Sequence, residues 1–364
     1  MGFRCGIVGL PNVGKSTIFN TLSKAKAQAS NYPFCTIDPN VGIVTVPDER
    51  LDKLTVMYKP QKTTSTTIEF YDIAGLVAGA SQGEGLGNQF LGHIKEVDAI
   101  LHVVRCFDDP NIIHVSGGVD PIRDIEVIDT ELCLKDLDTM MNRYQKTEKL
   151  CKSGDKEAKE VMPVYEKVKK ALEDGLPLRH LDLTEDEKLK VRDLAFLTLK
   201  PLMYCANVAE TDLPNGNDWV KQVTERAKKE NAEIVMISGK VESELVELAA
   251  EEQKDYLESL GLKEPGLNVL IRAGYQLLNL ITYFTAGEKE VRAWTIRKHT
   301  KAPQAAAVIH TDFERGFIRA EVMAYQDLVT LGSAAAVKEK GLFRLEGKEY
   351  VVQDGDVMLF RFSV

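Results

Sequence analysis

Residues 9–16 most restrict the folds open to this chain, because they read Gly-Leu-Pro-Asn-Val-Gly-Lys-Ser and match the pattern G-x-x-x-x-G-K-S/T. An apolar run precedes the motif at residues 5–8, and a helical pattern follows it from about Ser16 to Lys24. In this setting, backbone N–H groups and a helix N-terminus can surround phosphate oxygens. We expect Lys15 to neutralise the β- and γ-phosphates of a nucleotide, and the Ser16 hydroxyl to bind Mg²⁺.

Further apolar runs predict an α/β nucleotide-binding domain (G-domain) with a parallel-rich sheet. They are short and apolar at most positions, which suits strands covered on both faces. The first set lies at residues 41–46, 67–73 and 99–105, and a second set follows much later, at 202–206 and 234–237. We therefore expect the sheet to be interrupted along the chain and then resumed.

The interruption, residues 129–199, has a helical pattern. Apolar residues recur at helical spacing on both sides of Ser153-Gly154-Asp155, which predicts an antiparallel coiled-coil hairpin with arms of about 30 Å at about 1.5 Å per residue. Pro163 should start or kink the second arm. Thr184 and Glu187 have the spacing of a capping box for a further helix. A spacer role and a direct binding role are both open for this hairpin.

Length and pattern together suggest about two or three domains for 364 residues. We expect a nucleotide-binding domain from residues 1–128 and 200–280, with the helical insertion of residues 129–199 between these parts. After residue 281 the pattern changes to short strands and turns, including Asp354-Gly355 as a tight turn. Residues 281–364 are therefore predicted to form a separate small α+β domain.

Composition excludes several classes of protein. The net charge of −9 argues against a protein that coats nucleic acid without specificity. No apolar run approaches the roughly 18 residues of a membrane span, and the N-terminus lacks the pattern of a secretory signal. The six cysteines contain no C-x-x-C pair, so we expect reduced thiols, no zinc site and a cytoplasmic location. Nothing in the pattern requires more than a monomer.

Asp72 lies at the end of a predicted strand, in the sequence Asp-Ile-Ala-Gly of residues 72–75. We expect its carboxylate to hold Mg²⁺ through water and Gly75 to donate its N–H to the γ-phosphate. Four glycines follow between residues 79 and 87, in a segment that is costly to order and so suits a nucleotide-dependent switch; the alternative is a merely flexible loop. Thr36, between the first helix and the second strand, is the expected second hydroxyl ligand of Mg²⁺.

Leu76 follows Gly75, where many GTPases have a glutamine that orients water. We therefore expect slow intrinsic hydrolysis. Asn12, in the phosphate loop, is one candidate helper, as an expected support for K⁺. His114 is another, in a glycine-containing loop that could swing to the site, although a surface histidine is equally compatible with the pattern. The expected catalytic residues are Lys15, Asp72, Gly75 and His114.

These motifs resemble a known group of proteins. The P-loop, the Pro-Phe-Cys-Thr sequence of residues 33–36 and the glycine-rich run after Asp72 resemble the Obg-related branch of P-loop GTPases. Residues 283–325, including Val-Arg-Ala-Trp-Thr at 291–295, resemble a TGS domain, a ubiquitin-like β-grasp module. The domain order is similar to that of the YchF family of Obg-like ATPases. This resemblance implies an ATPase that binds the ribosome or a ribosomal subunit and regulates translation or the stress response.

The base-binding sequence departs from the usual guanine-reading N-K-x-D. Residues 207–210 read Asn-Val-Ala-Glu, and the longer Glu210 no longer sits at the bidentate distance from guanine. We expect Val208 to pack on the base and residues 238–240 to close over it. The residues expected to bind nucleotide are Asn12, Val13, Gly14, Lys15, Ser16, Thr17, Asn207, Val208, Glu210, Ser238 and Gly239.

Basic residues gather between Lys289 and Lys301, beside the single acid Glu290. The mixture of charge with one aromatic suits phosphate contacts and stacking on an exposed base of RNA. The alternative is a solvated β-grasp face with a buried tryptophan. The residues concerned are Arg292, Trp294, Arg297, Lys298 and Lys301.

Two other functions compete with a nucleotide-switched ATPase. One is a ribosome- or RNA-binding adaptor in which nucleotide is a slow structural ligand; the other is a GTPase of ordinary base preference. A P-loop kinase is disfavoured, because we find no arginine-rich lid and the switch-like segment has no use there.

We predict that ATP binds more tightly than GTP, because loss of a bidentate charged pair with a base shifts preference by about 1–3 kcal/mol. A direct competition assay measures this. GTP binding about tenfold more tightly than ATP would contradict the prediction.

Overall fold

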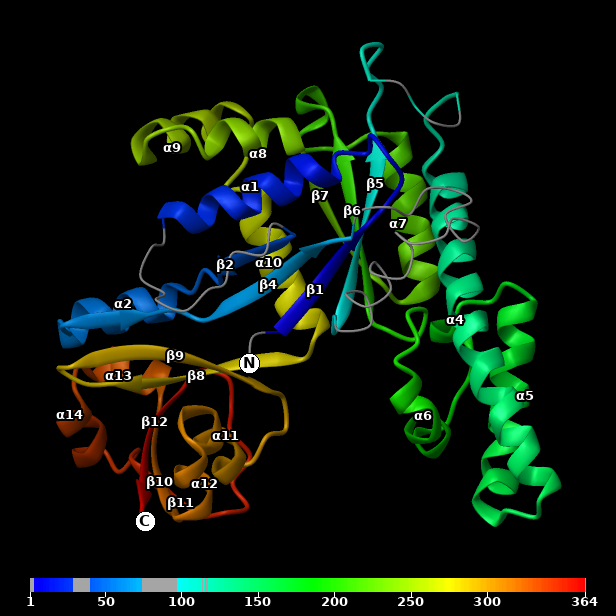
Figure 1. Ribbon diagram of the computed structural model, residues 1–364. Coiled ribbons are helices and arrows are strands. Elements are labelled where there is room, and N and C mark those ends of the chain that lie inside the picture. The colour runs from blue at the N-terminus through cyan, green and yellow to red at the C-terminus, as the bar shows by residue number, and fades with distance from the viewer. Residues whose placement is uncertain (1–2, 29–39, 74–96, 113, 115–116, 364) are drawn as a thin grey trace. The chain divides into compact units, whose positions relative to one another are not determined.

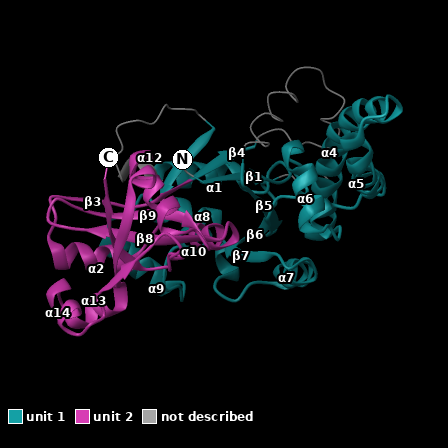
Figure 2. Ribbon diagram, turned by 90° about the horizontal axis from the view of Figure 1, so that it is seen from below, with its two compact units in different colours: residues 1–44, 69–270 teal, residues 45–68, 271–364 magenta. Residues whose placement is uncertain are grey.

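The computed structural model describes residues 3–28, 40–73, 97–112, 114 and 117–363 (Figure 1). The chain forms two compact units (Figure 2). The first contains residues 1–44 and 69–270, and the second contains residues 45–68 and 271–364. Each unit has its own sheet.

Six of the described strands form the sheet of the first unit, in the order β2-β4-β1-β5-β6-β7. The neighbours β1 and β5, β5 and β6, and β6 and β7 are parallel, which confirms the parallel-rich α/β fold. All eight residues of β5 and all seven of β6 are buried, as their apolar runs predict. The strands are β1 (Phe3–Val8), β2 (Val41–Thr45), β4 (Thr67–Asp72), β5 (Ala99–Cys106), β6 (Leu202–Val208) and β7 (Glu233–Ile237).

Helices lie on both faces of this sheet. α1 packs with α8 on one face, while α4 and α7 lie against β5, β6 and β7 on the other (Figure 1). Among the described residues, the α-helices of the unit are α1 (Lys15–Gln28), α4 (Pro121–Lys152), α5 (Lys156–Glu173), α6 (Glu185–Val191), α7 (Asp218–Glu230), α8 (Gly239–Leu245) and α9 (Ala250–Ser259). The same part of the chain forms the short 3₁₀ helices η2 (Leu178–His180), η3 (Arg192–Leu194) and η4 (Glu210–Asp212).

The predicted helical hairpin is present as α4 and α5, but its first arm is longer than expected. α4 begins at Pro121, with Asp120 as its N-cap, and its 32 residues span about 48 Å at about 1.5 Å per residue. The second arm begins after the N-cap Asp155, so Pro163 lies inside α5 and does not start it. The expected capping box of α6 is confirmed, because Thr184 and Glu187 each accept the other's backbone N–H.

One buried carboxylate ties the hairpin to the chain that returns to the sheet. Asp136 of α4 is 2% exposed, and its two oxygens accept three hydrogen bonds. The donors are the N–H of Leu197 at 2.8 Å, and the N–H and hydroxyl of Thr198, each at 2.7 Å. The Thr198 hydroxyl in turn accepts the N–H of Leu178. This cluster fixes the direction in which the chain leaves the hairpin.

The second unit has a mixed sheet in the order β11-β10-β12-β8-β9-β3, with apolar clusters on both faces. Asp354 and Gly355 form the predicted turn, and Gly355 takes a φ of +89°, which favours glycine. The strands are β3 (Lys62–Thr64), β8 (Leu280–Ala286), β9 (Glu290–Arg297), β10 (Phe317–Ala324), β11 (Arg344–Glu346) and β12 (Asp356–Phe362). The helices are α2 (Glu49–Tyr58), α11 (Ala302–Ile309), α12 (Thr311–Arg315), α13 (Tyr325–Leu331) and α14 (Ala334–Glu339).

Residues 45–68 contribute to this second sheet although they lie far from it in sequence. β3 pairs in parallel with β9, with Lys62 opposite Glu290, and Thr64 donates a 2.7 Å hydrogen bond to the Glu290 carboxylate. α10 (Gly266–Leu277) contains the boundary between the two units. The chain thus contributes to the second unit twice.

We predict that Asp136→Ala lowers the free energy of unfolding by about 3 kcal/mol, because the three buried donors lose their acceptor. Urea denaturation followed by circular dichroism measures the change. Asp138→Ala, which removes an exposed carboxylate from the same helix, is the control. Equal unfolding midpoints for the two variants would contradict the account.

Candidate nucleotide site

The loop of residues 9–14 takes a backbone shape that requires its glycines. Gly9 has a φ of +150°, and a Cβ there would lie 2.4 Å from the carbonyl oxygen of Val103 on β5. Gly14 has a φ of +98°, and a Cβ there would lie 2.1 Å from the amide nitrogen of Asn207. Asn12 also takes a positive φ, 63°. The loop therefore packs directly against β5 and β6, with no room for side chains at Gly9 or Gly14.

Asn207, at the end of β6, joins the two loops of the site. Its side-chain N–H donates to the carbonyl oxygen of Val13 at 2.8 Å, and its side-chain oxygen accepts the N–H of Gly239 at 2.9 Å. Asn207 is 4% exposed. Its amide therefore fixes the phosphate loop at a set distance from residues 238–239, which are expected to lie near the base.

Between these loops lies a cavity of about 760 Å³. Of the residues expected to bind nucleotide, only Val13 is not on its wall, and the Val13 carbonyl is engaged by Asn207. The cavity is lined by Asn12, Gly14, Lys15, Ser16, Thr17, Phe107, Asp108, Asp109, Ile112, Asn207, Val208, Ala209, Glu210, Thr211, Ser238, Gly239, Lys240 and Ser243. The structure thus brings together residues separated by more than two hundred positions.

Lys15 lines the cavity and interacts electrostatically with Asp72, at the end of β4. The Lys15 ammonium donates to the carbonyl oxygen of Leu10 at 2.9 Å, and burial lowers its pKa against the opposing effect of Asp72. Burial also raises the pKa of Asp72, against the effect of Lys15. Among the described residues, Oδ1 of Asp72 is a buried oxygen with no hydrogen-bond partner. A buried, unpaired carboxylate oxygen and the Ser16 hydroxyl fit the oxygen ligands that Mg²⁺ prefers.

Arg105 is a structural residue of the site that the sequence did not indicate. It is 1% exposed, and its guanidinium donates to the carbonyl oxygens of Phe107, Ile112 and Asp109 at 3.0, 3.0 and 3.4 Å. These contacts fold residues 107–112 around the guanidinium and form one wall of the cavity. No sequence signal could have revealed this, because an arginine near the end of a strand is most often exposed.

Two other described residues of the prediction, Asp72 and His114, do not line the cavity. His114 lies beside the N-terminal part of α4, where its Nε2 is 2.8 Å from Oδ2 of Asp124. Both side chains are almost fully buried, and Arg123 contacts the other oxygen of Asp124. Thr36 and Gly75, like Leu76 and the glycines of residues 79–87, lie outside the described residues.

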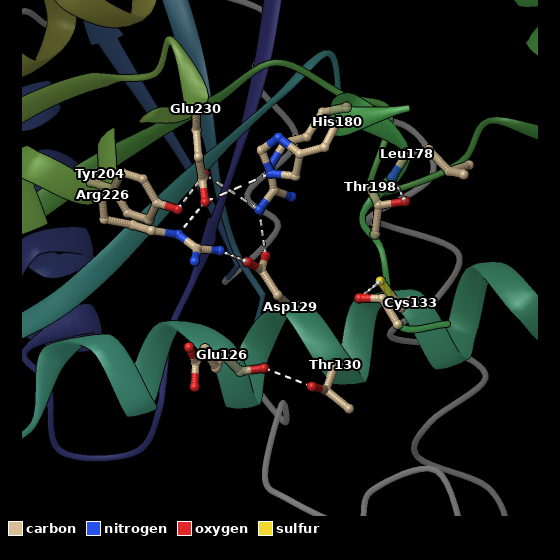
Figure 3. A network of polar contacts seen from close by, with 12 residues as sticks. Glu126, Asp129, Thr130, Cys133, Leu178, His180, Thr198, Tyr204, Arg226 and Glu230 are labelled. Atoms are coloured by element: carbon tan, nitrogen blue, oxygen red, sulfur yellow. Dashed lines mark hydrogen bonds and ion pairs between the residues drawn. The ribbon is translucent and has the colours of Figure 1, made fainter. Parts of the chain in front are cut away.

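A second cavity, of about 610 Å³, lies where the hairpin meets the sheet (Figure 3). Here Asp129 of α4 contacts Arg179 at 2.6 Å and Arg226 at 3.5 Å. Glu230 of α7 pairs with Arg226 and accepts a 2.8 Å hydrogen bond from Tyr204 of β6. The two carboxylates are matched by two guanidiniums, so the buried charges compensate one another. This cluster anchors the hairpin to β6, the strand that carries Asn207.

Trp294 in the second unit is half-buried. Its ring stacks on the Tyr283 ring, with 6.4 Å between the two ring centroids. Its indole N–H donates to the Thr285 hydroxyl at 2.9 Å. The Arg292 guanidinium lies 4.0 Å from the ring centroid of Trp294. Arg297, Lys298 and Lys301, the other basic residues predicted to contact RNA, are exposed. Together with Arg292 they are called the basic strip below. Lys301 pairs with Glu349 at 2.5 Å.

Comparison with protein families gives two matches. Residues 4–152 match the model described as a 50S ribosome-binding GTPase. Residues 280–363 match the model of the YchF GTPase C-terminal region, described as a protein of unknown function.

Curated relatives extend this similarity to the whole chain. The "Ribosome-binding ATPase YchF" of Bacillus subtilis (strain 168) is 57% identical over 366 residues, covering 100% of both chains. The protein of the same name from Escherichia coli O157:H7 is 58% identical over 364 residues, again with full coverage of both. This chain belongs to the YchF family.

Solved structures agree with the YchF assignment. The structure of the Schizosaccharomyces pombe YchF GTPase matches with a TM-score of 0.89 and 41% identity, covering 99% of this chain and 98% of that one. A GTP-binding protein from Pyrococcus horikoshii OT3 matches with a TM-score of 0.63 and 19% identity, covering 99% and 100%, and so shows the fold alone. The family resemblance and the fold class predicted from the sequence are confirmed. Within the described part of the chain, no helix has the length and apolar character to cross a membrane.

We predict that Asn207→Ala lowers the free energy of unfolding by about 1–3 kcal/mol, because two buried backbone groups lose their partner. We also expect weaker ATP binding, since the two loops of the cavity are no longer joined. Denaturation and titration calorimetry measure the two effects. Asn215→Ala, an exposed change nearby, is the control, and identical behaviour of both variants would contradict the prediction.

Proposed function

We propose that this YchF-family protein is a P-loop ATPase that binds the ribosome or a ribosomal subunit in a nucleotide-dependent manner and thereby regulates translation or the stress response. The observation that carries the proposal is the cavity between the phosphate loop and residues 207–210. The P-loop residues Lys15 and Ser16 both line this cavity. The curated relatives named as ribosome-binding ATPases support it, with more than half of all positions identical over the full length.

Lys15, Ser16 and Thr17 would bind the phosphates, with their backbone N–H groups at the N-terminus of α1. Mg²⁺ would be held by Ser16, by Thr36 and, through water, by Asp72. When bound, Mg²⁺ neutralises charge on the phosphate oxygens. Lys15 adds a second positive charge, and the N–H of Gly75 contributes a further hydrogen bond to the γ-phosphate.

The base would lie against Val208, with residues 238–240 closing over it. ATP is the preferred nucleotide, since residues 207–210 lack the lysine and aspartate with which related proteins read guanine. The competing function is a GTPase of ordinary base preference. Its support is the word GTPase in the names of the Schizosaccharomyces pombe relative and of the family matched by residues 4–152.

Hydrolysis would be slow, because Leu76 cannot orient water. Two residues remain candidates for assisting it. Asn12 lines the cavity and would support a K⁺ ion beside the phosphates. His114 would have to leave its 2.8 Å contact with Asp124 to reach the phosphates, and this leaves a buried carboxylate without that partner.

The exposed residues Arg297, Lys298 and Lys301 would contact ribosomal RNA phosphates. Arg292 and Trp294 form a stacked pair at the edge of this strip, and the guanidinium could exchange its aromatic partner for a base. An acidic protein with a local basic strip suits docking at a defined site better than general RNA binding.

We predict that sedimentation with purified ribosomes differs among three conditions: a non-hydrolysable ATP analogue, ADP and no nucleotide. Lys298→Glu should reduce sedimentation, because it removes a phosphate contact and adds repulsion. Lys340→Glu, the same change at an exposed lysine outside the strip, is the control. Sedimentation that is identical in all three conditions would instead support the adaptor, in which nucleotide is a structural ligand.

A further inference from the structure

A network of charged groups lies on the rim of the nucleotide cavity, at the end expected to bind the base. The Lys240 ammonium is 3.0 Å from Oε2 of Glu210, and both residues line the cavity. The Tyr256 hydroxyl, from α9, is 3.4 Å from Oε1 of Glu210 and 2.6 Å from Glu244. Lys240 also lies 4.0 Å from Glu244. The Lys240 ammonium therefore occupies Oε2 of Glu210, whereas the single proton of the Tyr256 hydroxyl lies between Glu244, at the shorter distance, and Oε1 of Glu210.

The occupied carboxylate matters for the choice of base. Guanine presents N1–H and an exocyclic amino group, and it is read best by a free carboxylate that accepts from both. Adenine presents an acceptor at N1, so it gains nothing from such a carboxylate. Replacement of aspartate by glutamate alone leaves a flexible acid that could still rotate to accept from guanine. A cation held against Glu210 removes that possibility.

The position of Lys240 is fixed by the fold. Lys240 directly follows Gly239, whose N–H is held by the side chain of Asn207, and both residues lie in the first turn of α8. The hydrogen bond to Glu210 raises the pKa of Lys240, so the ammonium is charged at neutral pH. The Lys240 side chain is 68% exposed, so solvent screens the ion pair and its energetic contribution is small.

We propose that Lys240 is a specificity-determining residue: it occupies the Glu210 carboxylate and so denies guanine its acceptor. This inference rests on the proposed ATP-binding function of the same cavity. Base preference then depends on the Lys240–Glu210 ion pair between α8 and η4, in addition to the length of the Glu210 side chain.

The experiment is equilibrium titration with ADP and GDP, which report on the base without hydrolysis. In Lys240→Met, which keeps the apolar stem, we expect the affinity for GDP relative to ADP to rise by about fivefold, the upper range for an exposed ion pair. Lys240→Arg should keep the wild-type ratio, because it keeps the pair. An unchanged ratio in Lys240→Met would overturn the inference.

A second background separates an effect through Glu210 from a direct effect on the nucleotide. In Glu210→Gln, the added change Lys240→Met should leave the ratio unaltered, whereas an equal rise in both backgrounds would contradict the inference. Lys221→Met, which removes a lysine paired with Asp218 on α7 away from the cavity, is the matched control. Failure of the wild-type protein to bind ADP or ATP would contradict the proposed function itself. If wild type prefers ADP but Lys240→Met leaves the affinity for GDP relative to ADP unchanged, only the inference is contradicted.

Discussion

The nucleotide cavity depends on one buried side-chain amide. Asn207 uses both of its polar atoms, donating to the phosphate loop and accepting from the loop expected to bind the base. A shorter or apolar residue would leave two backbone groups without a partner, and each such group costs about 1–3 kcal/mol. The close approach of this amide to Gly14 also explains why that position must be glycine. A single residue therefore sets the width of the site.

The strand that carries Asn207 also receives the anchor of the helical hairpin. Tyr204 lies three residues before Asn207 on β6 and donates to Glu230, within the ion cluster that contains Asp129 of α4 (Figure 3). The neighbouring His102 of β5 is buried, and burial together with nearby Arg179 and Lys15 lowers its pKa to about 3. It is therefore neutral at physiological pH and adds no charge to the interior. Compensated charge, rather than apolar packing alone, joins the hairpin to the sheet.

Local sequence signals predicted much of the fold. The P-loop between a strand and a helix, the resumption of the sheet at β6 and β7, and the capping box at Thr184 are each set by neighbouring residues. The start of α4 could also have been read, because Asp120 and Pro121 have the pattern of an N-cap and a first helical position. Ile125, Ile128 and Leu132 also follow helical spacing there.

Long-range features could not be read in the same way. β3 has three residues, too few for a pattern, and its pairing with β9 is specified only by a partner more than two hundred positions away. Arg105 binds the carbonyl oxygens of residues 107–112 because this segment curves around its guanidinium. No sequence pattern predicts that curvature. Likewise, the residues expected around the phosphates were predictable from the motif, whereas the contacts of Lys240 with Glu210 depend on how α8 and η4 meet.

The proposed function depends on a nucleoside triphosphate binding over the backbone amides of residues 12–17. Titration calorimetry with ATP and Mg²⁺ tests it most directly, using wild type and a folded Lys15→Ala variant. The account predicts saturable heat for wild type and its loss in Lys15→Ala. Absence of heat with wild type, or equal binding by both proteins, would contradict it.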